Sequence, residues 1–164
     1  MTSWAAQERP DLALAIILAP FLGARIIPTS LTRMAAYATQ ILPDWKQWWD
    51  PKKKENCDGP DYGYVQNSTH SLGQILQFGF RVFAFARRQP PAARRVWVVI
   101  NDHDESVNNG MILRLVETWE KSKAQNVQTL HFPIELQLPH DCISVEQPKG
   151  NTKVVYEQLM RLVG

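Results

Sequence analysis

Unbroken runs of apolar side chains predict the first two strands of this chain. Leu12–Leu18 and Val96–Ile100 are apolar at every position, and Pro20 follows the first run closely. An unbroken run, rather than an alternation of apolar and polar residues, is typical of a parallel strand that is buried on both faces. A third strand is predicted at about Val127–Phe132. The sequence therefore predicts a sheet of three parallel strands.

Helical periodicity fills the intervals between these strands. Thr2–Gln7 reads as the end of a helix, and amphipathic helices are predicted at about Ser71–Arg87, Asn108–Lys121 and Thr152–Leu162. The side chains expected on their buried faces are Leu72, Ile75, Leu76, Phe80 and Phe83, then Met111, Ile112, Leu115, Val116 and Trp119, then Val155, Leu159, Leu162 and Val163. Strands that alternate with helices predict an α/β fold, with right-handed crossovers and helices flanking the sheet.

Residues 28–71 interrupt this alternation. The segment is rich in proline, glycine, tryptophan and charge, and it has one predicted helix, Leu31–Leu42. We therefore predict a core of residues 1–27 and 72–164, with a loop-rich and partly helical insertion at residues 28–71.

Composition excludes several functional classes. The 164 residues suffice for one domain, and a net charge of +2 in short basic runs does not predict nucleic-acid binding. Leu12–Ile27 is too short to span a membrane and contains Pro20 and Arg25. Cys57 and Cys142 match neither a disulfide framework nor a zinc site, so we expect reduced thiols, a cytoplasmic location, and no metal or cofactor.

Candidate chemistry lies where the strands end, which is where parallel sheets carry their functional groups. Asp102, His103 and Asp104 directly follow the second strand, and His140 lies in the loop after the third. One alternative is that the aspartates cap the next helix, whose first turn favours negative charge. Another is that these four residues bind a divalent metal ion, although neighbours such as His103 and Asp104 would point apart.

The order of these segments resembles the C-terminal half of an α/β-hydrolase. Asp104-Glu105-Ser106-Val107 is similar to the loop that supplies the acid of that family's Ser-acid-His triad, and His140 occupies the place of its histidine. The resemblance implies Asp104 as the acid, with Asp102 as the alternative, and His140 as the general base. It also implies that residues 28–71 form the cap over a substrate pocket. The cap side chains expected to line that pocket are Trp48, Trp49, Tyr62 and Tyr64.

The chain departs from this family at the nucleophile, because Gly-x-Ser-x-Gly is absent. Ser3 falls in the first helix and Ser30, Ser68 and Ser71 in or beside the cap, so none is expected at a strand-to-helix elbow. We expect a serine hydrolase of ester or related acyl substrates that is truncated here, with Met1 an internal methionine and the first strand open to self-association. The alternative is a non-catalytic binding protein built on a remnant of the fold.

Overall fold

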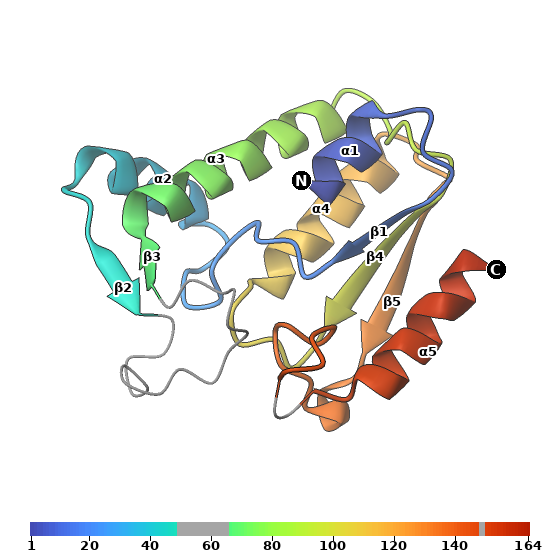
Figure 1. Cartoon of the computed structure of the whole chain (residues 1–164). Coiled ribbons are helices and arrows are strands. Elements are labelled where there is room, and N and C mark those ends of the chain that lie inside the picture. Colours follow the sequence, from blue (N-terminus) through green and yellow to red (C-terminus); the bar gives the residue numbers. More distant parts are fainter. Residues whose placement is uncertain (49–65, 148–149) are drawn as a thin grey trace.

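A parallel sheet of three strands forms the centre of the fold. The computed structural model describes residues 1–48, 66–147 and 150–164. In these residues the strand order is β1 (Ala15–Leu18), β4 (Val96–Asn101), β5 (Val127–Phe132), and both pairings are parallel (Figure 1). Ala15 pairs with Val96, and Val96 in turn pairs with Val127, so the three strands begin level with one another. The predicted α/β class, with a sheet of three parallel strands, is confirmed.

Strand β4 is apolar throughout because both of its faces are covered. Val96, Val98 and Ile100 belong to one hydrophobic cluster, whereas Val99 belongs to a second cluster on the opposite face. Side chains alternate along a strand, so a central strand needs an apolar residue at nearly every position. At full burial each of these aliphatic side chains contributes about 1.5–3 kcal/mol.

Helices cover the sheet on two sides. The first cluster takes side chains from α1 (Thr2–Glu8), α3 (Thr69–Ala86) and α4 (Asn109–Lys121). The second takes side chains from α5 (Thr152–Val163), which lies on the other side of the sheet (Figure 1). A short 3₁₀ helix, Ile134–Leu136, follows β5. No helix of the described residues is long and apolar enough to span a membrane.

The described part of residues 28–71, the predicted insertion, contains a helix and a pair of antiparallel strands. Helix α2 (Thr32–Ile41) packs along α3, and β2 (Lys46–Trp48) pairs antiparallel with β3 (Gln66–Ser68). This strand pair is not predicted from sequence, because its strands have three residues each and are largely polar. The predicted helix Leu31–Leu42 is confirmed to within a residue at each end.

The predicted buried faces are only partly right. The five positions of α4 predicted to be buried are all buried, but Ile75 of α3 and Val163 of α5 are 49% and 52% exposed. Helix α3 is apolar on more than one side, and it buries Gly73 and Gly79 while Ile75 is exposed. The glycines allow close contact, since a Cβ on Gly73 would overlap the hydroxyl of Thr39 in α2.

Candidate active site

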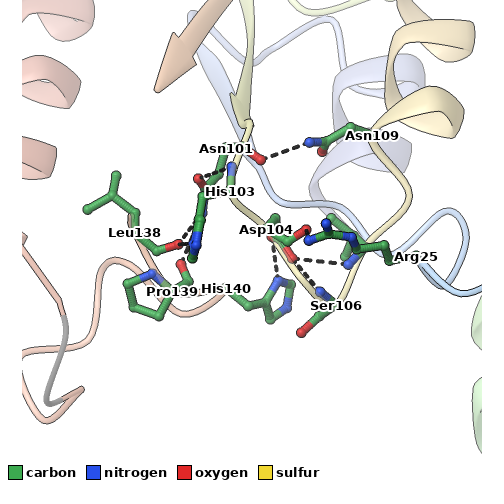
Figure 2. Close-up of polar contacts among 10 residues, drawn as sticks. Arg25, Asn101, His103, Asp104, Ser106, Asn109, Leu138, Pro139 and His140 are labelled. Carbon is green, nitrogen blue, oxygen red and sulfur yellow. Dashed lines mark hydrogen bonds and ion pairs between the residues drawn. The ribbon is translucent and has the colours of Figure 1, made fainter. Parts of the chain in front are cut away.

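Asp104 and His140 meet at the C-terminal edge of the sheet. Asp104 lies in the loop after β4 and His140 in the loop after β5, and His140 Nδ1 is 2.7 Å from Asp104 Oδ2 (Figure 2). The Asp104 side chain is fully buried, while 41% of the His140 side chain is exposed. A carboxylate only accepts hydrogen bonds, so Nδ1 carries the proton and Nε2 is the nitrogen left to act as a base.

The second carboxylate oxygen of Asp104 is held by its own loop. Asp104 Oδ1 accepts from the backbone N–H groups of Ser106 at 2.8 Å and Val107 at 3.0 Å. Helix α4 has a different cap, since the side chain of Asn108 accepts from the N–H of Met111. Asp104 is therefore not the helix cap, which removes that alternative for this residue.

The segment that follows β1 forms hydrogen bonds with the loop that carries Asp104. Arg25 donates from Nη1 to the carbonyl of Asp104 at 2.9 Å and from its backbone N–H to the carbonyl of Ser106 at 3.0 Å. Ala24 and Val107 form an isolated antiparallel bridge. Sequence analysis predicts neither Arg25 nor the rest of residues 23–27 as part of the site.

The histidine loop is tied to the end of β4. Asn101 donates from Nδ2 to the carbonyls of Leu138 at 2.9 Å and Pro139 at 3.1 Å, and its Oδ1 accepts from the N–H of His103 at 3.1 Å. His103 Nδ1 also lies 3.2 Å from the Leu138 carbonyl (Figure 2). A carbonyl can only accept, so this contact makes Nδ1 of His103 the protonated nitrogen.

The contact between acid and base shifts both of their pKa values. Burial raises the pKa of Asp104, but hydrogen bonding and charge attraction from His140, with the two backbone N–H groups, leave it below the ordinary 3.8. The hydrogen bond to Asp104 raises the pKa of His140 above 6.5, against the opposing effect of burial, and the charges of Asp104 and Asp141 add to it. The pair is therefore suited to hold an imidazolium while a proton is taken up at Nε2.

The alternative acid, Asp102, makes its side-chain contact outside this pair. Asp102 points to His131, with Oδ1 3.2 Å from Nδ1, and both side chains are more than 40% exposed. Asp102, the alternative acid, thus contacts a different histidine from His140. The described residues hold no group of three His, Cys, Asp or Glu side chains arranged for a metal ion, which removes support for the metal alternative there.

Two other side chains of nucleophilic type, Cys142 and Ser68, make no hydrogen bond to His140. Burial raises the pKa of Cys142 to about 11, so its thiol is protonated at neutral pH. Ser68 does lie between a strand and a helix, at the β3–α3 junction, so the expectation that no serine does so is wrong. Its hydroxyl donates to Asp44 and accepts from the N–H of Ser71, which makes it a helix cap.

Four aromatic side chains are predicted to line a substrate pocket. Trp49, Tyr62 and Tyr64 lie outside the described residues, and Trp48 is described only as the last residue of β2. The cap pocket and its four aromatic side chains stay a prediction.

Comparison with solved structures identifies the architecture. A soluble variant of monoglyceride lipase from Saccharomyces cerevisiae, solved with a substrate analogue, aligns with 98% of this chain at a TM-score of 0.62 and 12% identity. The chain has an α/β-hydrolase fold. The monoacylglycerol lipase of Paleococcus ferrophilus aligns with 97% of the chain at a TM-score of 0.59 and 18% identity. No sequence family and no curated protein matches the chain.

The match covers the C-terminal part of the α/β-hydrolase fold. The chain spans 59% of the first lipase structure and 63% of the second. The resemblance inferred from sequence is therefore confirmed at the level of the fold.

Proposed function

We propose that this chain supplies the acid and the general base of a serine hydrolase that acts on ester or related acyl substrates. Asp104 would hold His140 in the tautomer with a free Nε2, and His140 would take the proton from an attacking serine hydroxyl. The 2.7 Å contact between a fully buried carboxylate and a half-exposed imidazole is the observation that carries this proposal. The lipase neighbours support an acyl substrate through the fold alone.

The nucleophile must come from outside the described residues. Within residues 1–48, 66–147 and 150–164, His140 forms its side-chain hydrogen bond with Asp104, and no serine hydroxyl bonds to it. The sequence has no Gly-x-Ser-x-Gly either. We infer that the serine belongs to a polypeptide segment that pairs with the open edge of β1. This segment would come from a longer form of this protein or from a partner protein.

The open side of β1 supports this inference. Ala15 donates to the carbonyl of Arg95, so Ala15 and Ile17 turn their backbone groups toward β4. The backbone groups of Ile16 and Leu18 then point the other way, where no described residue bonds to them. An apolar strand with such an edge accepts another strand readily.

The test is the mass and labelling of the protein isolated from its source. We expect a fluorophosphonate probe to label a serine that lies outside this sequence, in a species heavier than 18.8 kDa or in a protein that co-purifies with it. Replacing His140 with Gln in the same background should abolish labelling. Labelling of a serine within these 164 residues would contradict the proposal.

A second candidate, a binding protein built on the same fold, is favoured by the same open edge. It predicts a native mass of 18.8 kDa, no labelling in any co-purifying protein, and a partner or second copy seated on β1. The labelling experiment therefore separates the two functions.

A further inference from the structure

We propose that Asn101 is a positioning residue that fixes the loop of His140 relative to the loop of Asp104. Asn101 is the last residue of β4 and is 2% exposed. It touches neither the imidazole nor the carboxylate of the pair by a hydrogen bond. Its role rests on the proposed function only in that the pair it positions is the proposed acid and base.

The backbone of Asn101 holds the acid side. Its carbonyl accepts from the N–H of Asp104 at 3.1 Å, which closes the turn that carries the carboxylate. The same carbonyl accepts from the side chain of Asn109 in the first turn of α4 at 2.8 Å. One carbonyl oxygen at the end of the central strand therefore binds both the turn that carries Asp104 and the first turn of α4.

The side chain of Asn101 holds the histidine side. Its two Nδ2 hydrogens go to the carbonyls of Leu138 and Pro139, the two residues that precede His140. The Pro139 carbonyl belongs to the peptide unit that contains the His140 nitrogen, so the hydrogen bond orients the chain as it enters His140. Pro139 also fixes its own φ and restricts Leu138, which leaves this short segment little freedom.

The orientation of the amide is determined by its partners. Two carbonyls can only accept, and the His103 N–H can only donate, so Nδ2 must face Leu138 and Pro139 and Oδ1 must face His103. Among the common side chains of this size, asparagine alone combines two donors on one atom with an acceptor. Leucine has the shape without these groups, and aspartate lacks the donors.

Asn126 offers a matched control at the opposite end of the sheet. It lies just before β5 and also donates from Nδ2 to two carbonyls, Pro91 at 3.1 Å and Ala93 at 2.6 Å. Replacing Asn126 with Ala removes the same kind of hydrogen bonds at the N-terminal edge of the sheet, whereas His140 lies at the C-terminal edge.

The experiment is a titration of His140 by NMR in the 164-residue chain, which requires no catalysis and so is independent of the proposed activity. We expect Asn101→Ala to lower the pKa of His140 toward 6.5 and to weaken or remove the downfield signal of its Nδ1 proton. Asn126→Ala should leave both unchanged while also lowering the melting temperature. If Asn101→Ala does not fold, Asn101→Leu keeps the branched shape of the side chain and tests the same loss of donors.

An unchanged His140 titration and Nδ1 signal in a folded Asn101 variant would overturn the proposal. Equal changes in the Asn126 variant would also overturn it, because the effect would then follow from general destabilisation. Failure of the serine-labelling experiment, by contrast, would leave this result intact.

Discussion

Replacing Asp104 with Asn should reverse the tautomer of His140. The two backbone N–H groups of Ser106 and Val107 require an oxygen, so the Asn carbonyl must take the place of Oδ1. The amide NH₂ then faces His140 Nδ1, which must accept, and the imidazole proton moves to Nε2. A base that is already protonated at Nε2 cannot take a proton from a serine.

The expected effects differ in size between activity and stability. In a form of the protein that contains the nucleophile, kcat should fall on the order of 10⁴-fold, about 5.4 kcal/mol in activation free energy. Hydrogen bonds to a charged group contribute about 1.5–3 kcal/mol and neutral ones about 0.5–1.5 kcal/mol. Exchanging one for the other should cost about 1–2 kcal/mol, a melting temperature lower by roughly 2–8 °C for a chain of this length.

Two-bond ¹⁵N–¹H correlation spectra of the imidazole measure the tautomer directly. We expect Nδ1–H in the native chain above the pKa of His140 and Nε2–H in Asp104→Asn. Asp11→Asn, which changes an exposed carboxylate bonded to Arg9, is the control and should leave His140 unaltered. Nδ1–H persisting in a folded Asp104→Asn variant would refute the reasoning.

Three further predictions concern stability and reactivity. The pKa of Asp104 is lowered in the folded chain, so its carboxylate contributes stability that is fully present above pH 3.8 and is lost as pH falls through the lowered pKa. The pKa of His140 is raised, so its imidazole contributes stability that is fully present below pH 6.5 and is lost as pH rises through the raised pKa. The drop in melting temperature caused by His140→Gln should therefore be largest between pH 3.8 and pH 6.5, and a drop that grows above neutral pH would contradict this. Cys142 should react with iodoacetamide at pH 7.5 only after unfolding in urea, as followed by mass spectrometry of the peptide that contains it; rapid alkylation of Cys142 in the native chain would show that its thiol is accessible. Gly73→Ala should destabilise the chain by about 1–3 kcal/mol through overlap with Thr39, and Thr39→Ala should restore part of the loss in denaturant melts. Equal stability of Gly73→Ala and the native chain would show that α2 moves away without cost.

The sequence predicts the sheet well because burial on both faces leaves a direct trace in composition. Val96–Ile100 has no polar position, and the structure places it between two strands and two hydrophobic clusters. The face of α3 is harder to predict, since that helix is apolar at Ile75 as well as along its core side. Close packing at Gly73 and Gly79 decides the matter, and no periodicity of apolar residues reports it.

The candidate site is likewise predictable from the sequence only in part. Strand ends bring Asp104 and His140 to one edge, so their meeting follows from topology that the sequence already predicts. Which aspartate faces which histidine depends on side-chain direction, and the structure pairs Asp102 with His131 instead. Asn101 carries no sequence signal at all, because an asparagine after a strand reads as an ordinary turn residue.

The unequal neighbours of the strands have a consequence for amide hydrogen exchange. Strand β4 lies between β1 and β5, so its amides should exchange only when the whole sheet opens. In β1 the N–H groups of Ile16 and Leu18 face outward and should exchange fast in the 164-residue chain, while those of Ala15 and Ile17 are protected. Slow exchange at Ile16 and Leu18 in a larger form or complex would register, residue by residue, the arrival of a fourth strand.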